Sequence, residues 1–312
     1  MPLLRFRNAP RERENAASPW KLGGLTPLQL AKNVYEQCVK DEVLTRSAAL
    51  SFYFAYALFP MLLFIVAVLG FFARNQALVN TFSYQVSLIM PPAAFNLLRN
   101  VMREIAAHAT GFKMLLGLGL ALWSASTGLS SVMDALNHCY NVEESRPYWK
   151  RHLISIALTV ALVGLTILSL VIVLYGTYIA DFVGERTGLE DATVTAWQIA
   201  QWPMALLMVA FAFALIYHWG PDVRRPWRWL TPGSLIGVSL WLAASLAFRT
   251  YLHYFNQYSR TYGSLGAGIV LLLWLLLSAM AILIGGEIDA EIAKAAAKRA
   301  VGEARRDEKK VA

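Results

Sequence analysis

Charged residues are scarce in this chain. Asp, Glu, Lys and Arg make up 15% of its 312 residues, and hydrophobic residues make up 57%. Soluble domains carry about 25% charged residues, so the composition argues against an ordinary soluble protein and indicates lipid as the main solvent. The net charge is +8. In a soluble protein this excess would point to nucleic acid, but the basic cytoplasmic loops of a membrane protein explain it better, and we expect no nucleic-acid partner.

Motifs for several common chemistries are also missing. The chain has no GxxxxGK[ST] phosphate loop and no GxSxG turn, so a P-loop ATPase is excluded and a serine hydrolase has no support. The five histidines are scattered without metal-ligand spacing, and the two cysteines, Cys38 and Cys139, form no CxxC pair. We therefore expect no catalytic residues, no metal, no cofactor and no enzyme activity.

The N-terminal segment, residues 1–46, is basic and has no apolar stretch in its first 30 residues, so we expect no cleaved signal peptide. Thr26-Pro27 is typical of a helix start. The residues after it predict an amphipathic helix on the inner membrane surface. At the other end of the chain, residues 290–312 are rich in Ala, Lys, Glu and Arg. We expect a charged cytoplasmic helix or tail there, a helix that runs from about Ile288 toward the end and frays into solvent.

Six apolar segments are long enough to cross a bilayer, which takes about 20 helical residues. The clearest, Ser264 to Gly286, contains no charged residue. Together they predict an all-α fold, a polytopic membrane helix bundle over residues 47–289 with amphipathic surface helices. Pro91-Pro92 opens a further segment that we expect at the outer surface, with a re-entrant hairpin as the alternative. The six spans are expected at about 48–72, 114–136, 153–180, 197–219, 233–255 and 264–286.

The distribution of Lys and Arg predicts the topology. Twenty-one of these residues lie in the N-terminal segment, the second and fourth loops between spans, and the C-terminal tail, whereas six lie in the other connections. Cytoplasmic loops carry the basic excess in membrane proteins. Both termini are therefore expected in the cytoplasm, which agrees with an even number of spans.

Polar side chains recur on single faces of several spans, and such faces either join helices or line a wet path. Arg249 is the ionisable residue best placed inside a span, where a charge by default marks function; the alternative is that it snorkels or pairs with an acid. Glu287 either pairs with Arg146, Lys150 or Arg151 or takes part in proton coupling, which would require burial. The candidate polar path comprises Tyr53, Tyr56, Pro60, Trp123, Thr127, Ser130, Asp134, Trp241, Ser245, Arg249, Tyr262, Gly263 and Glu287.

Basic residues of two cytoplasmic loops form a second candidate site, for anionic lipid headgroups, with plain topogenic charge as the alternative. They are Arg146, Lys150, Arg151, Arg224, Arg225 and Arg228. Small residues also recur four apart, as in Gly233xxxGly237, a spacing that lets helices approach closely.

Four stretches carry a resemblance to a known family: SAALSFYFAYALFPMLL (47–63), NHCYNVEESRPYWKR (137–151), PGSLIGVSLWLAASLAF (232–248) and the segment 256–292 that ends in GGEIDAEI. In these stretches the chain resembles the YihY/BrkB family of bacterial inner-membrane proteins, known as envelope integrity proteins and once labelled ribonuclease BN. The resemblance implies six helices, cytoplasmic termini and a role in the envelope or in lipid or lipopolysaccharide export.

These observations lead to three hypotheses. The first is an inner-membrane transporter or flippase for an amphiphilic envelope component, with membrane lipids and an envelope lipid or glycolipid as partners. The second is a membrane scaffold for envelope integrity that transports nothing. The third and weakest is a membrane-bound ribonuclease, for which no residue pattern speaks.

Overall fold

The computed structural model describes residues 19–72, 111–187, 190–223, 230–254 and 258–311. The regular elements among these residues are all helices, and the all-α assignment is confirmed. The segment after Pro91-Pro92 lies outside the described residues. The elements are η2 (Pro19–Gly24), α2 (Pro27–Lys40), α3 (Val43–Phe72), α6 (Gly111–Cys139), α7 (Tyr148–Thr187), α8 (Glu190–Trp219), α9 (Pro232–Tyr254) and α10 (Tyr258–Val311).

Four of the described helices are long and apolar enough to cross a membrane. They contain the segments Tyr148–Ser169, Val194–Trp219, Pro232–Tyr251 and Gly268–Gly302, which correspond to the predicted third to sixth spans. The predicted first and second spans fall on α3 and α6, which are 30 and 29 residues long. Pro60 lies inside α3 without ending it.

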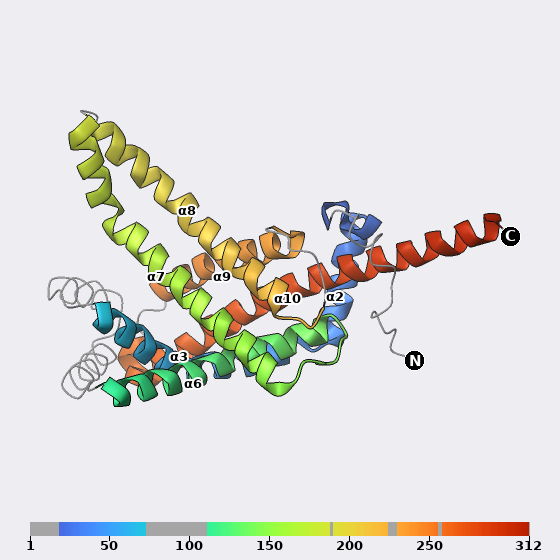
Figure 1. Ribbon diagram of the computed structural model, residues 1–312, viewed down its shortest axis with the longest axis horizontal. Helices are drawn as coiled ribbons and strands as arrows, with labels where there is room; N and C mark the ends of the chain where they lie inside the picture. The colour runs from blue at the N-terminus through green and yellow to red at the C-terminus, as the bar shows by residue number, and fades with distance from the viewer. Residues whose placement is uncertain (1–18, 73–110, 188–189, 224–229, 255–257, 312) are drawn as a thin grey trace.

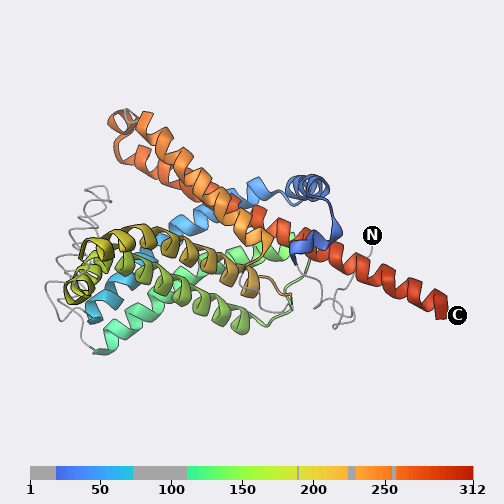
Figure 2. The same ribbon diagram turned by 90° about the horizontal axis from the view of Figure 1, so that it is seen from above.

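The six long helices form three antiparallel hairpins: α3 packs on α6, α7 on α8, and α9 on α10. Contacts of α6 with α7, α8 with α9, and α10 with α3 join the hairpins to one another. The α7/α8 hairpin rises away from α3 and α6 in Figure 1. Seen from above in Figure 2, α9 and the first part of α10 form another separate arm. The hairpins therefore meet at one end, here called the convergent end, and separate toward the other, the divergent end.

The largest hydrophobic core cluster lies at the convergent end and joins all three hairpins. Leu50 of α3, Leu136 of α6, Tyr217 of α8, Val238 of α9 and Leu283 of α10 are buried in this one cluster. Burial of apolar surface stabilises a fold roughly in proportion to the area removed from solvent. The joint between the hairpins is therefore the most firmly packed part of the described structure.

Glycines allow the closest helix contacts in this joint. A Cβ atom added to Gly285 of α10 would clash with the hydroxyl of Tyr217 and would lie 2.6 Å from the carbonyl oxygen of Gly233. At Gly237 an added Cβ would lie 2.9 Å from the Tyr217 hydroxyl. The predicted Gly233xxxGly237 pair is thus a true close-approach surface, where α9 meets α8 and α10.

The N-terminal helix α2 begins as predicted. Thr26 caps it, and Thr26 and Gln29 form a reciprocal capping box with Pro27 in the first turn. One side of α2 docks on α10, where Leu30 and Val34 pack against Ile288 and Ile292. The other apolar side, with Leu28, Tyr35 and Val39, is exposed, so a position on the inner membrane surface stays a prediction.

The prediction of a C-terminal tail that frays into solvent is only partly correct. Helix α10 runs unbroken from Tyr258 to Val311, about 80 Å at 1.5 Å per residue, with no break at residue 290. Ile288, Ala290, Ile292 and Ala297 are buried, because η2 and α2 fold back onto this part of α10. Only the last turns project beyond the bundle, toward the C-terminus in Figures 1 and 2.

Candidate functional site at the convergent end

A half-buried arginine, Arg146, organises the segment between α6 and α7. The guanidinium of Arg146 binds the Glu144 carboxylate with both arms, from Nε to Oε1 at 2.6 Å and from Nη2 to Oε2 at 2.8 Å. It also donates to the carbonyl oxygens of Trp219 and Gly220, at 3.1 and 2.9 Å. The fork of arginine suits this two-armed contact. Arg146 thereby fastens the segment between α6 and α7 to the end of α8.

Asp222 and Asn137 complete this network from the other side. Asp222 Oδ2 accepts a hydrogen bond from the Ser145 amide at 2.8 Å. The Asp222 amide donates to Asn137 Oδ1 at 2.7 Å, and Asn137 Nδ2 donates to Glu144 Oε2 at 3.0 Å. The loop network, defined as Asn137, Glu144, Ser145, Arg146 and Asp222, therefore ties the α6/α7 hairpin end to the segment after α8.

The charges in the loop network reinforce one another. Partial burial alone would raise the pKa of Glu144, but the hydrogen bonds and positive charge of Arg146 outweigh it and lower that pKa. Burial by itself would lower the pKa of Arg146, yet the hydrogen bond and charge of Glu144 and the charge of Asp222 raise it. Both groups are thus held ionised.

These contacts argue against headgroup binding at Arg146. Its side chain is only 11% exposed and its guanidinium faces protein acceptors, so it is not turned to the membrane surface. Arg151 binds Asp134 at 2.5 Å and is half-buried. Lys150 is exposed, and for it headgroup binding stays a prediction. Arg224, Arg225 and Arg228 lie outside the described residues.

The predicted polar stripe on α6 lies against α7. Ser130 donates to Ser155 at 3.0 Å, the Trp123 and His152 rings are 3.7 Å apart between centroids, and Asp134 holds the ion pair with Arg151. Thr127 donates to the Ser124 carbonyl of its own helix. In this structure Trp123, Ser130 and Asp134 join two helices, which is one of the two roles weighed for such a stripe.

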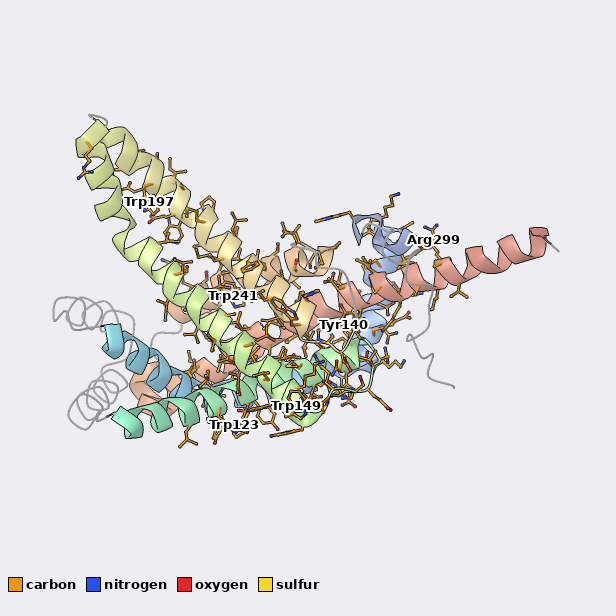
Figure 3. The ribbon with its side chains drawn as sticks, viewed as in Figure 1. Trp123, Tyr140, Trp149, Trp197, Trp241 and Arg299 are labelled. Atoms are coloured by element: carbon orange, nitrogen blue, oxygen red, sulfur yellow. The ribbon has the colours of Figure 1, made fainter. Side chains whose placement is uncertain are left out.

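The stripe on α9 divides into two parts. Toward the convergent end, Trp241 (labelled in Figure 3) donates from Nε1 to Ser278 of α10 at 3.2 Å. Farther out, the hydroxyl of Ser245 is buried without a hydrogen-bond partner among the described residues. Arg249 is exposed, and no hydrogen bond or ion pair joins it to another described residue.

The remaining path residues do not form one described group. Tyr53 and Tyr56 are exposed on α3, and Pro60 is half-buried. The side chains of Tyr262 and Gly263 lie outside the described part of the chain. The structure thus distributes the predicted path over separate helix contacts and exposed faces, and a continuous path through them stays a prediction.

Glu287 is the candidate residue with the least ordinary surroundings. It is completely buried, and neither carboxylate oxygen has a hydrogen-bond partner within the described structure. The alternative of an ion pair with Arg146, Lys150 or Arg151 is wrong, because Arg146 and Arg151 bind other acids and Lys150 is exposed. The burial that proton coupling would require is present.

Two neighbours of Glu287 differ from it in their bonding. Asp289 accepts hydrogen bonds from Thr231 Oγ1 at 2.6 Å and from the Gly233 amide at 2.9 Å, which fixes the start of α9 on α10. Cys38 of α2 lies close enough to respond to the same charges: burial, then Glu287 and Asp41, raise its pKa to about 11. Its thiol is therefore kept in the neutral form.

Sequence patterns alone missed Asn137, Asp222 and Asp289. Asn137 lies in the last turn of α6, Asp222 in the segment after α8 and Asp289 inside α10, and their partners lie 7 to 85 positions away. The available signal was indirect: Asn137 and Asp289 lie in the stretches that carry the family resemblance. The described residues contain no group of three or more His, Cys, Asp or Glu side chains placed to hold a metal ion.

Comparison with known proteins places this architecture in a family. The family model for Virulence factor BrkB matches residues 34–310. The putative ribonuclease-like protein YfkH of Bacillus subtilis is 30% identical over 267 residues, covering 86% of this chain and 96% of that protein. A UPF0761 membrane protein of Photobacterium profundum is 26% identical, covering 81% of this chain and 78% of its own length. No solved structure matches. The chain, with its apolar helical hairpins, belongs to the BrkB family of membrane proteins.

Proposed function

We propose that this protein crosses the bacterial cytoplasmic membrane six times, with both termini in the cytoplasm, and moves an amphiphilic envelope component of the lipid or lipopolysaccharide type. The chain supplies no phosphate loop for ATP, so the movement would be driven by a gradient, by a partner or by downhill flow.

The observation that carries this proposal is the unequal packing of the two ends. The hairpins share one buried core at the convergent end and separate toward the divergent end (Figures 1 and 2). Ile199 and Trp202 of α8 and Leu246 of α9, all toward the divergent end, are exposed. Apolar helix faces exposed in this way would meet lipid, so an amphiphile could reach them sideways from the bilayer.

The topology supports the same proposal. The six long helices run alternately between the two ends (Figure 1). The described part of the basic N-terminal segment (residues 19–46), Lys150 and the C-terminal turns of α10 all belong to the convergent end, which the positive-inside rule assigns to the cytoplasm. The protein would then be closed toward the cytoplasm and parted toward the outside.

Arg249 is the natural first contact for an anionic amphiphile. It is exposed on the outer part of α9 without a described partner, and its fork can donate two parallel hydrogen bonds to a phosphate. Ser245, one turn nearer the convergent end, has a buried hydroxyl that no described group satisfies.

Reconstitution tests the proposal. Purified protein in liposomes should speed the movement of a labelled phospholipid or lipopolysaccharide-type lipid between leaflets, relative to protein-free liposomes. Leu240→Ala, an exposed substitution on α9 that leaves Arg249 in place, is the matched control for substitutions of Arg249 in the same assay. Unchanged lipid movement with every labelled lipid would favour a scaffold.

The printed name of the Bacillus subtilis relative includes ribonuclease-like, so the same preparation should be incubated with RNA and divalent metal ions. We propose that this chain is not an enzyme and expect no cleavage above that of a mock purification. Cleavage that persists through a further purification step would overturn this part of the proposal.

A further inference from the structure

Glu287 lies where α10 meets three other helices. The next residue, Ile288, packs on Leu30 and Val34 of α2. The preceding Gly286 faces α6, since a Cβ added there would lie 2.5 Å from Leu136 and 3.9 Å from the Cys139 sulfur. On the α3 side, Val43 and Leu50 share a core cluster with Leu283 and Ala290 of α10. The carboxyl of Glu287 is therefore enclosed from several directions.

The polar atoms in this enclosure are not satisfied by the protein. Both oxygens of Glu287 are buried without a well-formed hydrogen bond in the described structure, with the Cys139 thiol and the Asp41 carboxyl as their nearest polar neighbours, and Gln37 Oε1, Asp41 Oδ2 and Ser47 Oγ also have no partner there. Gln37 and Asp41 lie one turn apart at the end of α2, and Ser47 lies on the face of α3 that carries Val43 and Leu50. A buried ionised carboxylate without partners is so costly that such groups normally become neutral.

The charges around Glu287 also favour its neutral form. Asp41 is near enough to raise the cost of ionising Glu287, whereas the ammonium of Lys294 acts in the opposite direction. That ammonium is already 3.1 Å from Glu291, and the nearby Arg46 turns to the backbone carbonyl of Asp41 at 2.8 Å. The group facing Glu287 from α6 is the Cys139 thiol, while Val43, Ser47 and Leu50 of α3 carry no charge. Three carboxyl groups thus share one close ammonium.

We propose that the acidic cluster formed by Asp41, Glu287 and Glu291 with Lys294 is a proton-binding site. Glu287 carries the proton, and in this neutral form it lets the junction between α2 and α3 dock on α10. When the proton leaves, a second negative charge appears beside Asp41 and the docked junction loosens. The step is a simple exchange of one proton with water, Glu287–COOH giving Glu287–COO⁻ and H⁺.

This inference does not depend on lipid transport, because it concerns the packing of the N-terminal helix on α10. The direction in which stability changes with pH follows from proton linkage. Between the ordinary pKa of a glutamate, about 4.3, and the pH at which the folded protein releases its proton, the folded state holds one more proton than the unfolded state. Stability from this site therefore falls as the pH rises through that window.

Infrared difference spectroscopy of the full-length protein in detergent tests the proposal directly. At neutral pH the wild type should show the carbonyl stretch of a protonated carboxylic acid, which Glu287→Gln removes. Glu36→Gln is the matched control, because Glu36 is an exposed acid of α2 paired with Lys32, and it should leave the band unchanged. A wild type without this band overturns the proposal.

Thermal unfolding across pH gives the second test. The melting temperature of Glu287→Gln should match that of the wild type in mild acid and should decline less as the pH rises, whereas Glu36→Gln should follow the wild type. If Glu287→Gln does not fold, Asp41→Asn replaces it and should move the loss of the carbonyl band to lower pH, because the negative charge that opposes ionisation of Glu287 is gone. An equal decline in wild type and Glu287→Gln contradicts the proposal. Added Na⁺ or Ca²⁺ that stabilises the wild type but not Glu287→Gln also contradicts the proposal, because the acidic cluster would then be a metal-ion site.

Discussion

The two ends of the bundle are made from the same six helices, yet they are held together differently. At the convergent end a shared core, close glycine contacts and the loop network join all three hairpins. Toward the divergent end large apolar side chains such as Ile199 and Leu246 are exposed. In lipid, exposed apolar residues cost nothing, since the tails around them are equally apolar.

This difference shows where sequence specificity is concentrated. Close backbone approach and hydrogen bonds between helices drive helix association in a membrane, and the glycine contacts and the loop network provide both at the convergent end. The divergent end is specified mainly by hydrophobicity, which any of several helix arrangements satisfies. A joint that is fixed at one end and free at the other permits relative movement of the hairpins.

The largest effect is expected from breaking the loop network. Arg146→Met leaves Glu144 and Asp222 without their cation, and removal of one partner of a buried ion pair costs about 3–5 kcal/mol; partial exposure places the expectation near the lower value. Lys32→Met is the matched control, since it removes only an exposed pair with Glu36 at 3.9 Å, worth about 0.3–0.5 kcal/mol. Thermal unfolding in detergent measures both.

The pH dependence of the same variant sharpens this prediction. Because the pKa of Glu144 is lowered in the folded protein, the stability it contributes is present above its ordinary pKa and is lost as the pH falls through the lowered value. Arg146→Met should flatten this acid-side loss. If wild type and Arg146→Met lose stability in parallel as the pH falls, the ion pair contributes no stability and the contrast between the two ends of the bundle is weaker.

A smaller effect is expected from adding one methyl group to a close contact. Gly285→Ala forces its Cβ against Tyr217 and the backbone of Gly233, and overpacking of this kind costs about 1–3 kcal/mol. Gly164→Ala of α7 has nothing within 4 Å of the added atom. It should be neutral or gain up to about 1 kcal/mol through helix propensity. Equal melting temperatures for the two variants would contradict the close packing.

The smallest effect on stability is expected at Arg249. Exposed substitutions usually change stability by less than about 0.5 kcal/mol, so Arg249→Leu and Arg249→Lys should both fold normally. If Arg249 binds a lipid phosphate, both should lose lipid movement, by about tenfold for a lost charge-assisted hydrogen bond of about 1.5 kcal/mol. Destabilisation of Arg249→Leu alone would mean a structural pair, and two fully active variants would mean that Arg249 only snorkels.

Much of the fold could be predicted because it depends on local patterns. Length and hydrophobicity located the helices, and Thr26-Pro27 located the start of α2. The continuous helix through residue 290 could not be predicted in the same way. Its polar composition is typical of a solvated tail, and only the docking of Leu30 and Val34 on Ile288 and Ile292 shows that one side is buried.

The site was less predictable because its contacts connect distant positions. The stripe on α6 was recognised, but its partner α7 was not, since periodicity gives a face and not a neighbour. Arg146 was assigned to the surface by its charge, whereas Glu144 and the carbonyl groups at the end of α8 enclose it. For Glu287, position in the sequence gave the two alternatives and burial separates them.

The central claim, a fixed convergent end and movable divergent ends, is tested most directly by distances between spin labels in liposomes. With Cys38 and Cys139 replaced, one pair of labels would occupy Ile199 of α8 and Tyr251 of α9, and the other Trp149 of α7 and Leu235 of α9, all exposed positions. We predict that the first distance is broadly distributed and changes when envelope lipids replace pure phosphatidylcholine, while the second stays narrow and constant. A constant first distance, or a second that changes as much, would contradict the account.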